Sequence, residues 1–226
     1  TISLGIGQGY NNFTMLQLSS ATATLVSGGQ RYKPRLVREI EDVSTGERRP
    51  MAHVTLPPLP LKPEHVELIT RALYGVTQEG TSVRSYLGAP YKTGGKTGTA
   101  QAVSIRANEK YNAAKLEEHK RDHSLYMAFA PLEAPTIALA IVVENAGFGS
   151  EAAAPISRRV FDYVIAGLWP SEEDIALTRE GKSGAPVGKQ RQASDVPLPG
   201  AITILPAVAG ASAQKLAQGA DAGSAR

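Results

Sequence analysis

Apolar side chains early in the chain recur at steps of three and four residues, the spacing of one face of an α-helix. The pattern predicts a helix that begins after Thr14, because Thr14 and Gln17 have the spacing of a capping box. Two glycines at 28–29 fit a C-terminal cap of this helix. Its buried face is expected to contain Met15, Leu18, Thr22 and Leu25.

Two later segments have helical patterns as well. The stiff segment PPLPLKP at 57–63 leads into a helix that begins at Pro63, a residue suited to the first helical position. The buried stripe of this helix is expected at Val66, Ile69, Leu73 and Val76. A final helix is expected to be capped by Ser150 and to end near Leu168. The residues that face a sheet from this helix are expected to be Ile156, Val160 and Val164.

The remaining patterns indicate strands. Residues 35–43 alternate like an exposed strand, with a turn at 45–46 and a returning strand at 51–56. A strand is expected at 95–103, and two more at 123–130 and 136–144 form an antiparallel pair, because only PLEAP joins them. The almost wholly apolar run at 137–143 predicts a strand that is covered on both faces. The predicted fold class is therefore α+β, an antiparallel sheet flanked by helices.

Two segments do not fit these elements. Residues 106–122 are rich in charge and have no clear apolar face, so we expect a long surface connection that is either functional or mobile. From residue 170 onward Gly, Ala, Pro, Ser and Gln dominate, and the segment 170–226 is expected to be a disordered, low-complexity tail. The folded domain is expected to span residues 1–169.

Bulk composition excludes a few functions. The formal charge of +3 is too small to suggest nucleic acid as a partner. The chain has no cysteine, which fits an oxidising compartment but also many cytosolic proteins. The longest apolar run, at 137–143, is far shorter than the roughly 20 residues of a membrane span. We expect no cofactor.

The stretch with the most chemistry is YKTGGKTGTAQ at 91–101. Lys96 supplies an ammonium group, and Thr97 and Thr99 supply hydroxyl groups beside it. The glycines of this stretch, Gly98 among them, allow another molecule to come close to the backbone. A cation and two hydroxyls in such a segment form a receptor for a carboxylate.

The sequence does not match the motifs that other interpretations of these features require. A phosphate-binding P-loop needs a glycine five positions before Gly95, where the chain has Pro90. The early glycines lack the full dinucleotide fingerprint, since Tyr10 stands where its last glycine belongs. His119 and His123 have acidic neighbours, but their spacing matches no metal-ligand pattern, so no metal is expected.

K-T-G is one of the short motifs of penicillin-binding proteins and serine β-lactamases. Here it occurs as GKTGTAQ, and four further segments follow the same family in the same order: GIGQGY at 5–10, GVTQEGTS at 75–82, DHSLYMAFAP at 122–131 and IVVENAG at 141–147. Over residues 1–169 the chain resembles the class B penicillin-binding proteins. The resemblance implies the C-terminal portion of a β-lactamase/transpeptidase-like fold. The GIGQGY and FAP contexts favour a transpeptidase over a hydrolytic β-lactamase.

The family's reaction is serine acyl transfer, which cross-links peptidoglycan stem peptides that end in D-Ala-D-Ala. The resemblance implies that Lys96, Thr97 and Thr99 bind the carboxylate of the substrate or of a β-lactam. It further implies that the Thr99 N–H is one oxyanion donor, that the Thr99 carbonyl pairs with the substrate backbone, and that Gly98 keeps this approach open. Lys92-Thr93-Gly94 is a second K-T-G, but only Lys96 is followed by T-A-Q and a strand-like run.

The family also implies partners and a location. A membrane glycosyltransferase and proteins of the cell-elongation complex are the expected partners. The expected location is the periplasmic face of the bacterial inner membrane, with an anchor upstream of Thr1.

Two motifs of the family are not found in their expected order. Its S-x-x-K serine and S-x-N segment precede G-x-G-Q-G, so we expect them before Thr1. The only S-x-x-K string here, from Ser212 to Lys215, follows K-T-G and lies in the predicted tail. We therefore expect this chain alone to be inactive. The alternative is a non-catalytic relative or fragment that binds cell-wall peptide or a protein partner, and the residues before Thr1 discriminate between the two.

Overall fold

The structure is a computed structural model, and it describes residues 7–9, 11–103 and 111–196. Its centre is a three-stranded antiparallel sheet with the order β5-β6-β7. The strands are β5 (Gly94–Ala100), β6 (His123–Ala130) and β7 (Ile137–Val143). The predicted antiparallel hairpin of the last two strands is confirmed, and β6 begins at His123 as expected.

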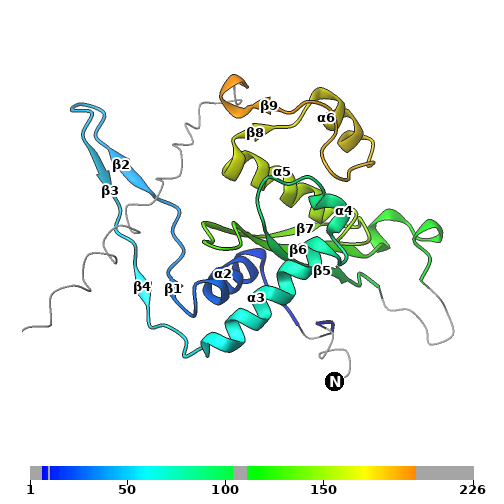
Figure 1. Ribbon diagram of the computed structural model, residues 1–226, viewed down its shortest axis with the longest axis horizontal. Coiled ribbons are helices and arrows are strands. Elements are labelled where there is room, and N and C mark those ends of the chain that lie inside the picture. The colour runs from blue at the N-terminus through cyan, green and yellow to red at the C-terminus, as the bar shows by residue number, and fades with distance from the viewer. Residues whose placement is uncertain (1–6, 10, 104–110, 197–226) are drawn as a thin grey trace, which may run out of the picture.

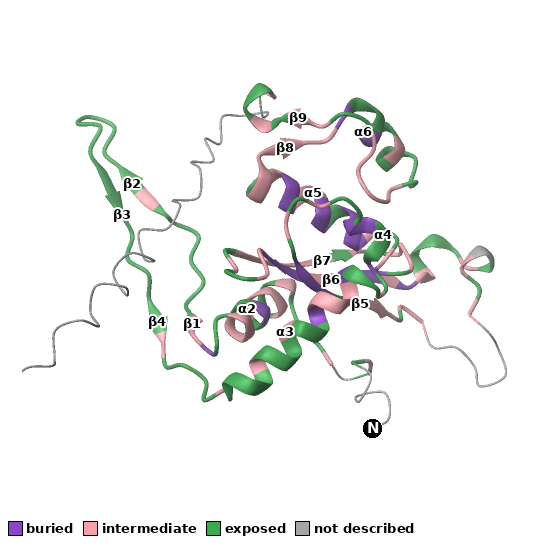
Figure 2. Ribbon diagram, in the orientation of Figure 1, coloured by how far each residue is buried: buried purple, intermediate pink, exposed green. Residues whose placement is uncertain are grey.

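Helices lie on both faces of this sheet, which confirms the predicted α+β class (Figure 1). Helix α2 (Met15–Val26) and helix α3 (Pro63–Gln78) cover one face, and helix α5 (Ala153–Ala166) covers the other. The short helix α4 (Val83–Tyr86) packs beside α3 and α5. Buried residues concentrate on β6 and α5, so the core lies between this strand and this helix (Figure 2).

Helix α2 forms as predicted. The Thr14 hydroxyl accepts a hydrogen bond from the Gln17 N–H at 3.1 Å, and the Gln17 side chain accepts one from the Thr14 N–H at 2.9 Å. This reciprocal pair is the capping box that the sequence predicts. Thr22 is buried on the sheet side, where its hydroxyl lies 3.7 Å from the sulfur of Met127.

Helix α3 begins at Pro63 as predicted, but part of its buried stripe is wrong. Ile69 is exposed, whereas Leu73 and Thr77 are the buried residues of this helix. The Thr77 hydroxyl donates to the carbonyl of Thr93 at 2.8 Å, so the buried hydroxyl is satisfied. The spacing of apolar residues cannot predict that a polar residue such as Thr77 is buried, because its burial depends on a hydrogen bond to a distant residue.

Helix α5 turns a different face to the sheet from the predicted one. Ile156 and Val164 are exposed, and the buried positions are Ala153, Ala154, Ser157 and Phe161. Small side chains bring the helix close to the strands, and the Ser157 hydroxyl bonds the Tyr86 hydroxyl at 2.5 Å. The helix is preceded by Ala152, without a side-chain cap, so the prediction of Ser150 as the cap is also wrong.

Two predictions about strands are corrected. β2 (Glu39–Glu41) pairs with β3 (Arg48–Pro50) directly after the turn, whereas β4 (Thr55–Leu56) pairs with the distant β1 (Arg31–Tyr32). The predicted return at 51–56 is therefore wrong as a partner of residues 35–43. The prediction that the strand at 137–143 is covered on both faces is also wrong. The side chains of β7 are only half-buried, and Val142 is exposed, because β7 is an edge strand of the described sheet.

Residues 168–196 carry regular structure. They form β8 (Leu168–Trp169), α6 (Glu172–Arg179), β9 (Arg191–Gln192) and a 3-10 turn (Ala193–Asp195). The prediction of disorder is therefore wrong for residues 171–196, whereas residues 197–226, with Ser212 and Lys215, lie outside the described residues. None of the helices in the described ranges is long and apolar enough to cross a membrane.

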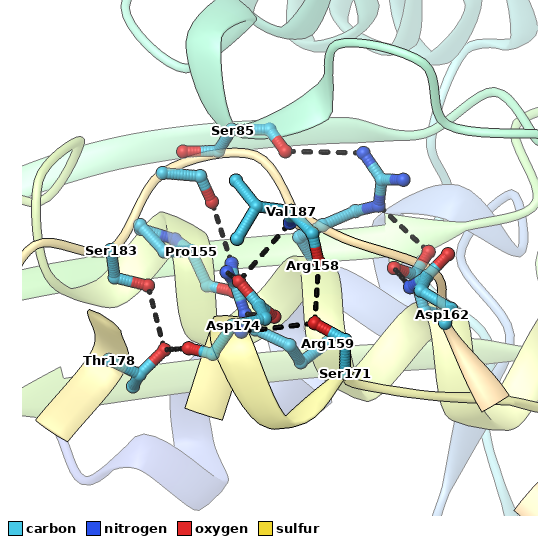
Figure 3. A network of polar contacts seen from close by, with 12 residues as sticks. Ser85, Pro155, Arg158, Arg159, Asp162, Ser171, Asp174, Thr178, Ser183 and Val187 are labelled. Carbon is cyan, nitrogen blue, oxygen red and sulfur yellow. Dashed lines mark hydrogen bonds and ion pairs between the residues drawn. The ribbon is translucent and has the colours of Figure 1, made fainter. Parts of the chain in front are cut away.

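Buried polar contacts hold this C-terminal segment on α5 (Figure 3). The guanidinium of Arg159 binds the carboxylate of Asp174 through two nitrogens, at 2.5 and 3.1 Å. The hydroxyl of Ser171 caps α6 by accepting the Asp174 N–H at 3.0 Å. A pattern of apolar residues misses this packing, because charge pairing and capping hold the segment in place.

Buried tyrosines make the stability of this core sensitive to alkaline pH. Burial raises the pKa of Tyr126 to about 12 and the pKa of Tyr86 well above its ordinary value. The Tyr126 hydroxyl bonds the Ser82 hydroxyl at 2.9 Å inside the core. Because the folded state favours the protonated phenol, this stabilisation is complete below the unfolded pKa near 10 and is lost as pH rises through about 12.

We therefore expect the free energy of unfolding, measured by urea titration, to fall steeply above about pH 10 in the native chain. In a Tyr126→Phe variant the fall should be shallower, since the phenylalanine has no proton to lose. The lysines titrate in both proteins, so the difference between the two curves isolates Tyr126. Parallel curves between about pH 9 and 12 would contradict the expectation.

Candidate active site

Strand β5 carries the K-T-G residues, and its first two glycines pack directly against aromatic side chains. A Cβ atom at Gly95 would overlap the hydroxyl oxygen of Tyr126, and one at Gly94 would lie 2.5 Å from the ring of Phe129. These contacts leave no room for a side chain, so the two glycines let the strand lie directly on the core. The strand ends at Ala100, three residues before the predicted end.

The outer edge of β5 has no neighbouring strand among the described residues. Thr97 and Thr99 pair with Tyr126 and Ser124 of β6, and Lys96 pairs with Met127. Since paired residues share a face, the two threonine side chains lie on the α5 face and the Lys96 side chain on the other. The hydroxyls and the ammonium group therefore flank one open edge.

Lys96 and Lys92 differ in their environments. Lys96 is exposed, its ammonium group donates to the carbonyl of Thr97 at 2.6 Å, and in the described ranges no carboxylate forms an ion pair with it. Lys92 lies 3.0 Å from a carboxylate oxygen of Glu133, whose hydrogen bond and charge raise the pKa of Lys92. Lys92 and Glu133 also line a separate groove of about 610 Å³, which none of Lys96, Thr97 and Thr99 lines.

Two side chains that sequence reasoning did not single out contact this strand. The hydroxyl of Thr81, in the turn before α4, lies 2.9 Å from the hydroxyl of Thr97. The side-chain amide of Gln8 donates to the carbonyl of Thr99 at 2.5 Å. Both residues lie in segments that the sequence marks, GVTQEGTS and GIGQGY, but no spacing rule places either one beside the strand.

Gly98 has close packing on the α5 face of the strand. Gly149, in the loop before α5, lies so close that a Cβ atom on it would be 2.7 Å from the Gly98 carbonyl oxygen and 2.9 Å from the Gly98 nitrogen. A Cβ atom at Gly98 itself would lie 3.3 Å from the Cβ of Leu125. The close approach of Gly149 explains the glycine at position 149. The Leu125 contact, on the face opposite α5, is one reason for a glycine at position 98, and the predicted approach of a substrate remains a second.

The histidines have structural contacts. His123 Nδ1 accepts a hydrogen bond from the Asn145 N–H at 3.0 Å, and His119 lies 3.4 Å from Glu117 at the surface. In the part of the chain that the structure describes, no group of three or more acidic, histidine or cysteine side chains is arranged to hold a metal ion.

Comparison with known proteins identifies the family. Residues 1–162 match the family described as the penicillin binding protein transpeptidase domain. The chain belongs to this family. The peptidoglycan D,D-transpeptidase MrdA of Haemophilus influenzae is 38% identical to it over 177 residues. That match covers 76% of the chain but 27% of the relative, so the chain spans about a quarter of this relative's length.

Solved penicillin-binding proteins share the fold. Pseudomonas aeruginosa PBP2, in complex with WCK 5153, has a TM-score of 0.56 and 30% identity over 72% of the chain and 32% of that structure. Helicobacter pylori PBP2, in complex with MreC, has a TM-score of 0.53 over 73% of the chain and 27% of that structure. Its 23% identity supports likeness of fold alone. Strand β5 therefore lies within the part of the chain that matches the transpeptidase domain.

Proposed function

We propose that this chain supplies the K-T-G strand of a peptidoglycan D,D-transpeptidase that also binds penicillin. The outer edge of β5 has no neighbouring strand in the described part of the chain, and no carboxylate there forms an ion pair with Lys96, which together support this function. An exposed cation on one face and two hydroxyls on the other, with a strand edge between them, suit a peptide that ends in a carboxylate. Family membership supports the same reaction class.

The proposed reaction has two steps. A serine oxygen attacks the carbonyl of the penultimate D-Ala, the peptide C–N bond breaks, and the terminal D-Ala leaves with the serine proton. An amine of a neighbouring stem peptide then attacks the ester, and the serine regains a proton as the new amide forms. A β-lactam reacts in the first step only, because its leaving group stays attached in the opened ring.

Each K-T-G residue has a proposed role in these steps. Lys96 and the hydroxyls of Thr97 and Thr99 bind the terminal carboxylate. The Thr99 N–H stabilises the oxyanion that forms on the attacked carbonyl. The backbone of the substrate extends along the outer edge of β5, which places the carbonyl beside that donor.

The proposal also names a location and partners. A peptidoglycan transpeptidase meets its substrate on the periplasmic face of the inner membrane, and we place this chain there. A membrane glycosyltransferase supplies the glycan strands that such an enzyme cross-links. The Helicobacter pylori relative forms a complex with MreC, which supports proteins of the elongation machinery as partners.

A non-catalytic domain that only binds cell-wall peptide or a protein partner is the second candidate. Within the chain, the only S-x-x-K string lies after K-T-G, from Ser212 to Lys215. The two candidates differ in the residues that precede Thr1, where an S-x-x-K serine and an S-x-N segment belong to the enzyme alone.

A fluorescent penicillin tests the proposal directly. We expect no covalent band when the 226-residue chain is incubated with the probe, because no serine of the family's motif precedes its K-T-G strand. The full-length protein should give a stoichiometric band under the same conditions. A stoichiometric band on the chain alone would contradict the expected inactivity, and no band on the full-length protein would favour the non-catalytic candidate.

A further inference from the structure

The side-chain amide of Gln8 forms a two-point contact with the outer edge of β5. Its nitrogen donates to the carbonyl of Thr99 at 2.5 Å, and its oxygen accepts from the Gln101 N–H at 3.4 Å. These two backbone groups bracket Ala100. One carboxamide thus takes the place that a residue of a neighbouring strand would take on this edge.

The backbone around Gln8 is shaped for this contact. Gly7 and Gly9 both have positive φ angles, 81° and 73°, in the left-handed region that favours glycine. A Cβ atom at Gly7 would meet nothing within 4 Å, so conformation rather than space requires the glycine there. Two left-handed glycines with a glutamine between them present the carboxamide to a strand that is 91 residues away in sequence.

The contact fixes the direction of the proposed oxyanion donor. Along a strand, the N–H and C=O groups of one residue point to the same side, and residues two apart share that side. Because Gln8 holds the carbonyl of Thr99 and the N–H of Gln101 outward, the Thr99 N–H is held outward as well. This is the direction from which a substrate carbonyl must approach.

We propose that Gln8 is a positioning residue for acyl transfer, which holds the Thr99 peptide groups so that the Thr99 N–H points at the developing oxyanion. This inference rests on the function proposed above. A carbonyl oxygen has two lone pairs, so Gln8 occupies one and leaves the other for a substrate N–H. The G-x-G-Q-G segment thereby acts through the K-T-G strand.

Two substitutions test the role in the full-length protein. Gln8→Ala removes the carboxamide, and Gln8→Glu keeps its shape but places an acceptor against the Thr99 carbonyl. Stopped-flow acylation by a fluorescent penicillin separates initial binding from the acylation step. We expect both variants to slow the acylation step by roughly tenfold, with initial binding changed by less than about twofold, since an oxyanion donor acts mainly on the transition state.

Gln30 provides a matched control. Its side-chain amide also donates to a backbone carbonyl, that of Arg31 at 3.0 Å, but Arg31 belongs to β1, which pairs with β4 and not with β5. Gln30→Glu should therefore leave the acylation step unchanged. Hydrogen exchange at the Gln101 N–H, measured in the 226-residue chain, should become faster in Gln8→Ala and stay the same in Gln30→Glu.

The outcomes separate the two proposals. If the wild type is acylated and both Gln8 variants are acylated at the wild-type rate, the role of Gln8 is overturned and the proposed function stands. A parallel loss of binding, acylation and melting temperature would also overturn it, because it would indicate a merely structural role. A wild-type protein that is never acylated would overturn the proposed function itself, and the role of Gln8 with it.

Discussion

Alanine in place of Lys96 is expected to slow penicillin acylation of the full-length protein by roughly 100-fold, the size of effect seen when one charge-stabilising donor is lost from an acyl-transfer site. Lys96 is exposed beside the open edge of β5, and its ammonium group donates only to the neighbouring Thr97 carbonyl among the described contacts. That group is therefore available to a carboxylate. In the proposed function, its removal takes away the cation that binds the carboxylate of both the substrate and the β-lactam.

Lys92→Ala is the control for this change, because Lys92 belongs to a second K-T-G string in the same stretch. Its ammonium group is paired with Glu133, and both side chains are more than half exposed. Exposed pairs of this kind are screened by water and contribute little, so the loss should change neither acylation nor stability much. Equal acylation rates for the two variants, measured with the same fluorescent penicillin, would contradict the assignment of Lys96.

The elements that sequence reasoning predicted well are those that local chemistry decides. The capping box of α2 and the first-turn proline of α3 are fixed by residues within four positions of each other. The short PLEAP connection likewise forces β6 and β7 to pair. Such signals can be read from the chain itself, because both partners lie in one short segment.

The wrong predictions concern features that depend on contacts between residues far apart in the sequence. The sheet-facing side of α5 is made of Ala153, Ala154, Ser157 and Phe161, whereas Ile156 and Val164 are exposed, because contacts with β6 and α4 rather than the local apolar pattern select the buried face. The pairing of β1 with β4 spans a whole hairpin, which no local pattern reports. Residues 171–196 fold onto α5 through buried charges, although their composition is typical of a disordered tail.

The residues of the candidate site also fall into two groups, those that the sequence motif indicates and those that only the structure reveals. The motif alone pointed to Lys96, Thr97, Gly98 and Thr99. The contacts of Thr81 and Gln8 with that strand join residues 16 and 91 positions apart, so only the folded chain brings them together. The motif therefore indicates the proposed reacting edge, and the fold indicates which residues contact that edge.

The start of the K-T-G stretch is held by a buried ion pair on α5. Asp162 is fully buried, and its carboxylate accepts hydrogen bonds from Arg158 Nε at 2.7 Å, from the Tyr91 hydroxyl at 2.8 Å and from Gln190 Nε2 at 2.8 Å. Burial and the charge of Asp162 raise the pKa of Tyr91 far above its ordinary value, so this hydroxyl remains a donor. Through Tyr91 the pair anchors the segment that leads into β5.

Asp162→Ala is therefore expected to lower the free energy of unfolding by about 3–5 kcal/mol, the typical cost of leaving one partner of a buried ion pair without its counter-charge. Arg158 is 3% exposed, so water cannot replace the lost carboxylate. Glu172→Ala is the matched control: Glu172 forms an ion pair with Arg191 at 2.9 Å, but its side chain is 78% exposed, and the expected loss is below about 1 kcal/mol.

Urea unfolding of the 226-residue chain measures both losses, and a lower midpoint with an unchanged slope is the expected signature. A double variant, Arg158→Met with Asp162→Leu, should recover much of the loss, since apolar side chains of similar size leave no charge unpaired in the core. If the double variant is less stable than Asp162→Ala, the hydrogen bonds of the pair matter more than its charges. Equal losses in the free energy of unfolding for Asp162→Ala and Glu172→Ala would show that the buried pair stabilises the fold no more than the exposed one. That result would contradict the anchoring of β5 through Tyr91 and Asp162.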